Sequence, residues 1–393
     1  MKKNKNRFLL GFFLGMLAMA VVVGGVGTGL YFANKNTSGK TISEKTSQKL
    51  DYINKLIDAK FLNKVNESDL EDGIYKGLLE GLNDPYSVYY TAEEYRKMME
   101  QTSGTYSGIG ALVSQNAETG IITVVKAFAD APAAKAGVKN GDIIYKVKGK
   151  EVTGVDINNV VTEMKGEKGT TVDITVYRES EKKYIDFTIT RDQVNEPTVE
   201  YKMLDKKKKI GYIQISQFEE VTYDQFTKAL DDLKKQGMKA VIFDVRSNPG
   251  GLYETVCKML DEILPEGNLV STKDKYGNAE KQTSDSKCLD MPMVVLQNKD
   301  SASASEIFAG AIQDFNAGKI VGTQSFGKGI VQTILPLSDG SAVKLTVQDY
   351  YTPSGKNIHG KGITPDVEAE LEENATSDTQ LEKAKETIME LMK

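Results

Sequence analysis

Two short stretches carry the residues that could do chemistry: SASASE at residues 301–306 and GKGIVQ at residues 327–332. A serine hydroxyl is a weak nucleophile unless a base removes its proton, and a lysine amine can be that base when burial lowers its pKa. The chain contains a single histidine, His359, and nothing beside it is arranged as an aspartate–histidine pair. We therefore expect His359 to be structural, and a serine hydrolase built on this chain to use another base.

Ser303 is predicted to lie where an apolar strand, MPMVVLQ at residues 291–297, gives way to a helix. Two interpretations are open. Ser303 and Glu306 match the S-x-x-E capping box, which satisfies free N–H groups of a first helical turn but explains neither Ser301 nor Ser305. Alternatively, the free N–H groups and the positive end of the helix dipole beside Ser303 could hold a developing oxyanion.

Lys328 is flanked by glycines, which let other backbone approach closely, and the residues after it are typical of a strand. On a strand, Lys328, Ile330 and Gln332 would face the same way, so that the Gln332 amide could hold the lysine amine in position. The competing interpretation is an ordinary surface lysine followed by a solvated strand residue. Spacing alone does not choose between the two.

A second candidate site lies in residues 106–194, where short strands alternate with turns. The stretch YSGIGALV at residues 106–113, followed by PAAKAGVKNGDIIYKVKG at residues 132–149, resembles a PDZ domain. In that resemblance Gly108, Ile109, Gly110 and Ala111 form the loop that binds a peptide carboxylate, and the following strand offers an edge to an extended peptide. The plain alternative is a glycine turn before a strand. A PDZ domain implies a ligand with a free, apolar carboxy terminus.

The whole pattern resembles the carboxy-terminal processing peptidases, also called tail-specific proteases. The resemblance rests on the serine and lysine stretches, on the PDZ segment, and on three further motifs: DPYSVYY at 84–90, DVRSNPGGL at 244–252 and YYTPSGKNIHGKGITPDV at 350–367. It implies that Ser303 is the nucleophile, Lys328 the general base and Gln332 the orienting third member. It also implies an oxyanion hole made by Gly250 and the amide of Ala304.

Two further positions follow from the resemblance. Asp314 matches a family position and is expected to support the structure around Ser303. Some relatives carry arginine where this chain has Lys165, at the end of the PDZ helix. Lysine lacks the planar five-donor fork of arginine, so any regulatory switch built on a bidentate contact would be weaker or different here.

The predicted fold class is multidomain α+β. It comprises a transmembrane helix, a helical amino-terminal region with two amphipathic helices between residues 42 and 101, a PDZ domain, and an α/β serine-protease core of the ClpP/crotonase-like kind with a β-rich cap. The expected segments are a basic tail (1–7), a transmembrane anchor (8–32), a linker and helical region (33–100), the PDZ domain (101–194), the Ser/Lys peptidase core (195–370) and a carboxy-terminal helix (371–393).

The membrane prediction depends on the amino terminus, where basic residues within 2–7 precede an uncharged run from residue 8 to residue 32. That run is long enough to span a bilayer, and the basic flank places the amino terminus in the cytoplasm. A cleaved signal peptide is the alternative, because residues 18–20 read Ala-Met-Ala. In both cases we expect the catalytic domain to lie outside the cytoplasm. If the anchor is retained, we expect a single-pass protein of the cell membrane that contacts the lipid bilayer.

The remaining predictions concern partners and cofactors. A net charge of -5 argues against nucleic acid, and neither a phosphate loop nor a metal motif is present in the sequence, so we expect no cofactor and no metal. Expected partners are protein or peptide substrates with apolar carboxy termini, and a second copy of the chain through the helical region. Cys257 and Cys288 could form a disulfide or stay as two thiols. Rival functions are a non-catalytic PDZ scaffold or chaperone in the cell envelope, and a Ser-Lys amidase or esterase acting on a small substrate.

Overall fold

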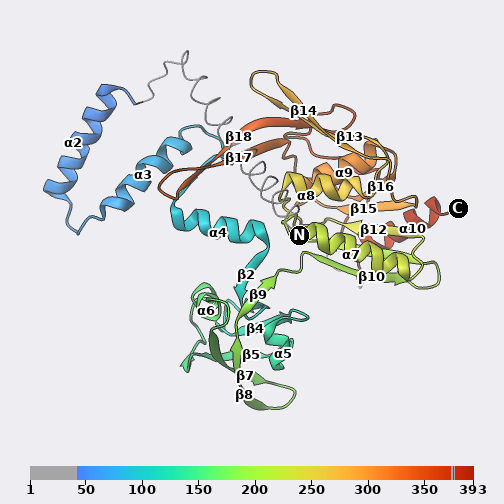
Figure 1. Ribbon diagram of the computed structural model, residues 1–393, viewed down its shortest axis with the longest axis horizontal. Helices are drawn as coiled ribbons and strands as arrows, with labels where there is room; N and C mark the ends of the chain where they lie inside the picture. Colours follow the sequence, from blue (N-terminus) through green and yellow to red (C-terminus); the bar gives the residue numbers. More distant parts are fainter. Residues whose placement is uncertain (1–41, 373–374, 376) are drawn as a thin grey trace, which may run out of the picture. The chain divides into compact units, whose positions relative to one another are not determined.

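The protein is described here by a computed structural model that covers residues 42–372, 375 and 377–393 (Figure 1). The chain divides into two compact units, Met1–Glu71 and Asp72–Lys393. The helix α2 (Glu44–Lys60) begins at Ser43, whose hydroxyl accepts a hydrogen bond from the Thr46 N–H. The helix α3 (Glu67–Glu80) follows, and both confirm the two predicted amphipathic helices. A third helix, α4 (Ala92–Ser103), was not predicted; a full capping box between Thr91 and Glu94 starts it.

The predicted anchor at residues 8–32 and the basic tail before it lie outside the described residues. Within residues 42–372, 375 and 377–393, no helix has both the length and the apolar character that crossing a membrane requires. A spanning helix needs about 20 mainly apolar residues, whereas α2 has 17 residues and is charged at both ends. The predicted transmembrane helix and the predicted single-pass membrane location are corrected on this finding, and the bilayer as a partner is not shown.

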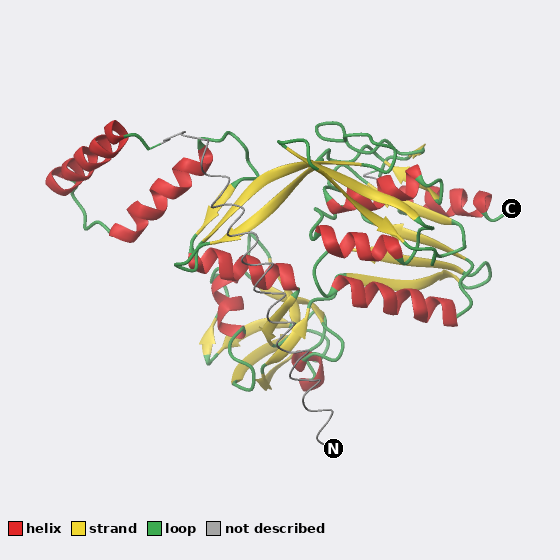
Figure 2. Cartoon of the chain, turned by 45° about the horizontal axis from the view of Figure 1, so that its top comes forward, coloured by secondary structure: helices red, strands yellow, loops and turns green. Residues whose placement is uncertain are grey.

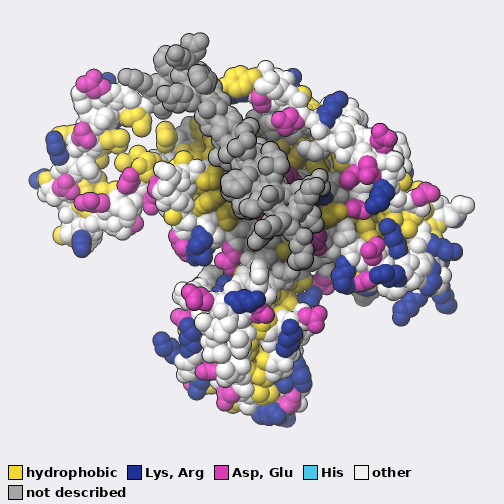
Figure 3. Space-filling view, viewed as in Figure 1, with side chains coloured by type: hydrophobic (Ala, Val, Ile, Leu, Met, Phe, Trp, Pro, Cys, Tyr) yellow, Lys and Arg dark blue, Asp and Glu magenta, His cyan; other side chains and the backbone are white. Residues whose placement is uncertain are grey.

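A β module follows α4 (Figure 2). It has a hydrophobic core of its own. Its five main strands are joined in the order β3-β4-β5-β7-β8, which leaves β3 at an edge. In Figure 3, exposed hydrophobic side chains run between charged ones on this module. The elements are β2 (Thr105–Gly108), β3 (Ala111–Gln115), β4 (Ile122–Ala127), α5 (Pro132–Ala136), β5 (Ile143–Val147), β6 (Lys150–Glu151), α6 (Ile157–Met164), β7 (Thr171–Arg178), β8 (Lys183–Thr190) and β9 (Asp192–Asn195).

The core sheet has six strands in the order β10-β11-β12-β15-β16-β19. It is parallel from β11 to β19, and β10 pairs antiparallel at one edge. Such a sheet is covered on both faces, which explains the nearly continuous apolar runs of its strands. The elements are β10 (Val199–Asp205), β11 (Ile210–Ile215), α7 (Thr222–Lys235), β12 (Ala240–Asp244), α8 (Tyr253–Asp261), β15 (Met293–Gln297), α9 (Ala304–Asp314), β16 (Gly318–Gly322), β19 (Val367–Glu368) and α10 (Thr379–Leu391).

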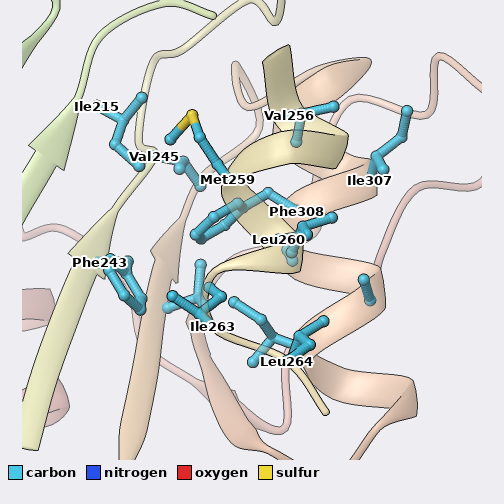
Figure 4. Close-up of a cluster of buried hydrophobic side chains, with 14 of the residues drawn as sticks. Ile215, Phe243, Val245, Val256, Met259, Leu260, Ile263, Leu264, Ile307 and Phe308 are labelled. Atoms are coloured by element: carbon cyan, nitrogen blue, oxygen red, sulfur yellow. The ribbon is translucent and has the colours of Figure 1, made fainter. Parts of the chain in front are cut away.

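Alternation along the strands assigns side chains to the two faces. Phe243 of β12 is fully buried in the cluster formed with α7, α8 and α9, where it packs edge-on against Phe308 at 5.4 Å between ring centroids (Figure 4). Ile242, its neighbour, belongs to the cluster on the other face, with Ile388 of α10. The carboxy-terminal helix therefore covers the second face of the sheet. Because β15 runs into α9 through the loop at 298–303, the packing of α9 on the first face fixes where Ser303 lies.

A second sheet lies over the core and corresponds to the predicted β-rich cap. Its long strand β18 pairs with β1, β13 and β17. The DPYSVYY motif joins this sheet through β1, and the Ser87 hydroxyl accepts the Thr346 N–H at 3.0 Å. The strands are β1 (Val88–Tyr90), β13 (Gly267–Asp274), β14 (Ala279–Ser284), β17 (Ile330–Pro336) and β18 (Ala342–Tyr351).

The multidomain α+β prediction is confirmed for the PDZ-like module and the α/β core.

The two cysteines are both free: Cys257 is buried in α8 and Cys288 is exposed. Burial raises the pKa of the Cys257 thiol to about 12, so that this sulfur stays protonated. Pairing of the helical region with a second copy stays a prediction.

Candidate active site

Ser303 caps the amino terminus of α9 with an unusual backbone conformation. Its φ of 55° lies in a region that residues other than glycine rarely adopt, which marks a strained position held by its surroundings. The flanking serines provide part of that support. The Ser301 hydroxyl donates to the Val245 carbonyl at 2.8 Å, and the Ser305 hydroxyl donates to the Asn248 carbonyl at 2.9 Å. Ser301 and Ser305 therefore fasten the loop to the end of β12, a role that the capping box did not explain.

Glu306 connects the serine stretch to the lysine stretch. Its side chain is fully buried, and its Oε2 accepts the backbone N–H groups of Ser303 and of Lys328, both at 2.8 Å. Its Oε1 accepts the Ser325 hydroxyl at 2.5 Å and the Gly327 N–H at 2.7 Å. A buried carboxylate is stable only when its oxygens are well bonded, and here the four donors come from both stretches. The S-x-x-E pattern predicted the contact with Ser303; the three contacts with residues 325–328 were missed.

The glycines around Lys328 allow close contact with the loop at residues 357–362, as expected. A Cβ added to Gly329 would lie 2.5 Å from the backbone nitrogen of His359, and one added to Gly327 would lie 2.9 Å from that of Lys361. His359 thus contributes its backbone, and not its imidazole, to this contact with Gly329. Lys328 itself precedes β17, which begins at Ile330, so it lies in the loop and not on the predicted strand.

The Lys328 amine lies in a setting that disfavours its charge. Burial is the main cause that lowers the pKa of the amine, and the nearby charge of Lys344 lowers this pKa further. The charges of Asp84 and Glu306 act in the opposite direction. Its Nζ lies over the ring of Tyr86, 4.5 Å from the centroid. No hydrogen bond joins this amine to the Ser303 hydroxyl within the part of the chain that the structure describes. Ser303 and Lys328 line one cavity, and the amine lies over the Tyr86 ring.

Gln332 lines the same cavity, although its amide donates to the Thr346 hydroxyl at 3.3 Å. The pairing of β17 with β18 shifts between Val331 and Gln332, which interrupts the regular alternation of side chains. Strand alternation therefore does not relate Gln332 to Lys328, in contrast to the sequence-based expectation.

Gly250 lies directly against Ser303. A Cβ at Gly250 would be 2.9 Å from the Ser303 Cβ and 3.0 Å from the Ala304 nitrogen, and the φ of Gly250 is +107°, so both space and conformation require glycine. The Gly250 N–H donates to the Asn248 side chain at 2.8 Å. The N–H groups of Ala304 and Gly251, in contrast, have no hydrogen-bond partner among the residues that the structure covers. The turn thus presents free N–H donors beside Ser303, whereas the Gly250 N–H is already bonded to the Asn248 side chain.

These residues converge on one cavity of about 1140 Å³. Its lining includes all five residues that the sequence proposed for the reaction: Ser303, Ala304, Gly250, Lys328 and Gln332.

Asp314, at the other end of α9, accepts the Ser354 N–H at 2.9 Å and lies 3.7 Å from the Lys356 amine. Burial raises its pKa, but hydrogen bonds from Thr352 and Ser354 outweigh this and lower it. Asp314 therefore holds the loop at residues 352–356.

The glycine loop of the PDZ-like module is also well formed. The carbonyl of Ile109 accepts the Ala133 N–H at 2.7 Å, and that of Gly110 accepts the Phe128 N–H at 3.0 Å. Gly110 has a φ of +76°, and a Cβ there would lie 2.3 Å from the Cβ of Ala131, so this position requires glycine. Gly108 and Ile109 are buried, and Ala111 opens the edge strand β3.

Lys165 is engaged beside this loop. Its Nζ pairs with Glu100 of α4 at 2.5 Å and lies 4.7 Å from the centroid of the Tyr106 ring. The same ring would be 3.0 Å from a Cβ at Gly108. A stack of Lys165 and Tyr106 therefore lies against the start of the glycine loop.

The comparisons with known proteins agree with this architecture. Residues 209–369 match peptidase family S41, residues 107–189 match the PDZ domain, and residues 28–94 match the amino-terminal domain of the activating protease CtpB. A protein of Staphylococcus epidermidis named "Probable CtpA-like serine protease" is 36% identical over 358 residues, which are 90% of this chain and 71% of the relative.

Two solved structures are also similar. The photosystem II D1 C-terminal processing protease shares 27% identity, with a TM-score of 0.49 over 88% of this chain and 91% of the other. A Bacteroides fragilis protein described as an S41 protease shares 16% identity, with a TM-score of 0.54 over 81% of this chain and 90% of the other, which shows a common fold.

The fold and the site define a serine protease with a PDZ domain. The identity to the staphylococcal relative extends over most of both chains, so the chain belongs to the CtpA-like serine proteases of peptidase family S41. Its substrates are accordingly peptides or proteins.

Proposed function

We propose that Ser303 is the nucleophile of this protease and Lys328 its general base. The observation that carries the proposal is the Glu306 carboxylate, which accepts the backbone N–H groups of both residues at 2.8 Å. The lowered pKa of Lys328 supports the assignment, because a base is effective when its pKa approaches the working pH. Gln332, on the same cavity, is proposed to orient the amine once a substrate is bound.

The reaction would begin when the Lys328 amine turns from Tyr86 toward Ser303 and takes the proton of its hydroxyl. The serine oxygen then attacks the substrate carbonyl carbon, and the oxygen of that carbonyl becomes an oxyanion. The free N–H groups of Ala304 and Gly251 would donate to it, and Gly250 would contribute if its N–H left Asn248. The ammonium of Lys328 gives its proton to the departing amine. The Lys328 amine then deprotonates a water molecule, which attacks the acyl carbon on Ser303. The acyl group leaves as the carboxylic acid, and the proton on Lys328 returns to the Ser303 oxygen.

We further propose that the PDZ domain recognises substrates by their apolar carboxy termini, so that cleavage falls near the end of the chain. Two features of the module support this. The strand β3 is at the edge of its sheet, where an extended peptide can add as a further strand. Leu112 on this strand is 49% exposed, which offers an apolar contact to the peptide. Gly108, Ile109, Gly110 and Ala111 are proposed to bind the terminal carboxylate through their backbone.

A cleavage assay with a denatured protein that ends in apolar residues tests the catalytic assignment. We expect the unmodified protein to cut it and the Ser303→Ala and Lys328→Ala variants to leave it intact. Lys319→Ala is a matched control, because Lys319 is a half-exposed lysine of β16 outside the cavity. Cleavage at the unmodified rate by Lys328→Ala would contradict the role of the lysine. Amidation of the substrate's carboxy terminus is expected to weaken capture by the PDZ domain.

A further inference from the structure

The cavity carries more acidic than basic groups around the proposed nucleophile. Five carboxylate residues line it: Glu196, Glu219, Glu220, Asp224 and Glu254. Within the residues that the structure covers, none of the five forms an ion pair with a lysine or arginine side chain. Unpaired carboxylates at a protein surface are common, so the exposed members of this set carry no argument by themselves.

Glu219 is different because it is buried without a partner. The residue is 5% exposed, and its Oε2 is fully enclosed and has no hydrogen-bond partner in the described part of the chain. The carboxylate packs against Gly104, where an added Cβ would lie 2.3 Å from that oxygen. Burial and repulsion from Glu196 raise the pKa of Glu219 to about 7. A buried carboxyl group without a partner costs stability, so folding alone does not explain its presence.

Glu219 is also close to the proposed reaction centre. The residue before it, Phe218, donates its N–H to the Gly250 carbonyl at 2.9 Å and accepts the Leu252 N–H at 2.6 Å. From the spacing of paired strands and of consecutive Cα atoms, the Cα of Glu219 lies within about 9 Å of that of Gly251. An extended peptide advances about 3.3 Å per residue. A peptide that runs from Gly251 toward Glu219 would therefore cover this distance in about three residues.

We propose that Glu219, with Glu196 beside it, forms a subsite for the lysine or arginine side chain of a substrate residue within about three positions of the cleaved bond. The inference rests on the proposed function, since it assumes cleavage at Ser303. Glu219 lines the cavity, and an ammonium or guanidinium group there would form charge-assisted hydrogen bonds with its carboxylate once the side chain turns the enclosed oxygen away from Gly104. A metal ion is a poorer occupant: it needs several ligands, and the described residues contain no cluster of three or more His, Cys, Asp or Glu placed to hold one.

The test uses four synthetic peptides with the same free, apolar carboxy terminus. They differ at one position within three residues of a mapped cleavage site, which carries lysine, norleucine, glutamine or glutamate. For the unmodified protein we expect kcat/KM to be about tenfold higher for the lysine peptide than for the norleucine peptide, and lowest for the glutamate peptide. In Glu219→Gln the ratio of lysine to norleucine is expected to fall to about one. Asp231→Asn removes the same charge outside the cavity and should keep the tenfold ratio.

Binding of the same peptides to the Ser303→Ala protein, measured by fluorescence anisotropy, separates this inference from the proposed function. If the Ser303→Ala protein still cuts the peptides at the mapped site, but binds the lysine peptide more tightly and Glu219→Gln removes that difference, the subsite stands and the catalytic proposal fails. If all peptides are cut equally well, or if Glu219→Gln keeps the preference for lysine, the subsite is overturned while the catalytic proposal stands. Because Glu219→Gln keeps the side-chain shape and removes an unpaired buried charge, we expect it to fold, which circular dichroism checks.

Discussion

Replacing Glu306 by glutamine tests whether one carboxylate holds the site together. The carboxylate accepts four hydrogen bonds, two on each oxygen. Glutamine keeps the shape but has one acceptor oxygen, so its NH₂ group must face two of the donors. A hydrogen bond to a charged group contributes about 1.5–3 kcal/mol, so the loss of two costs about 3–6 kcal/mol. This is a large part of the roughly 5–15 kcal/mol by which folded domains are stable.

The loss should appear in stability and in turnover. We expect a lower melting temperature and, well below it, a kcat reduced about 100-fold, because displacement of a catalytic group by about 1 Å has that effect. The pH profile adds a readout that a purely structural residue would not move. The charge of Glu306 raises the pKa of the Lys328 amine, so its removal should shift the rise of kcat/KM to lower pH.

Glu262→Gln is the matched control for this variant. Glu262 accepts one hydrogen bond, from the Tyr223 hydroxyl at 2.6 Å, and is not part of the cavity lining. We expect it to lose at most about 1.5–3 kcal/mol of stability and to keep its kcat. A folded Glu306→Gln protein with unchanged kcat and an unshifted pH profile would refute the argument that Glu306 positions Ser303 and Lys328.

Three further predictions follow from single contacts. Tyr86→Leu removes the ring that stabilises the Lys328 ammonium, so the rise of kcat/KM should move to lower pH, whereas Tyr86→Phe should keep it in place; equal profiles for both would contradict this. Asp378 accepts two hydrogen bonds from Arg246, at 2.9 and 2.8 Å, and these lower its pKa although burial raises it. Its stabilisation is present above the unfolded pKa near 3.8 and is lost as pH falls through the folded value, so Asp378→Asn should lower the melting temperature at pH 7 and have a smaller effect near pH 3. The raised pKa of Glu219, about 7 against 4.5 for the unfolded side chain, means that the folded protein binds a proton between these values. Stability should therefore fall by up to about 3 kcal/mol as pH rises from 4.5 to 7, and melting temperatures of Glu219→Gln should not show this decline.

Several parts of the site were predictable because they depend on neighbouring residues. The helix start at Ser303 follows from the S-x-x-E pattern and the apolar residues after it. The need for glycine on both sides of Lys328 follows from the lack of a Cβ, which allows backbone to approach. The PDZ module was recognisable by the order of its glycine loop and the segment that begins at Pro132.

Other parts were not predictable because they join residues far apart in the chain. The Ser305 hydroxyl donates to the Asn248 carbonyl, 57 positions away in the chain, only because the start of α9 lies beside the turn after β12. The register shift before Gln332 depends on the pairing of β17 with β18. The membrane prediction rested on hydropathy alone, at residues outside the described ranges; within those ranges no helix is long and apolar enough to span a membrane.

The sequence by itself determined the chemical parts: a serine at a helix start, a lysine between glycines, a glycine turn at the end of a buried strand and a PDZ domain. These depend on side-chain chemistry and on hydrogen bonds within a few residues of each other. Only the tertiary structure decided that Glu306 joins the two stretches, that Lys328 lies over Tyr86, and that Glu219 is buried without a partner. Such contacts depend on how the core sheet and the sheet above it pack, because packing sets which distant groups meet and which lose contact with water.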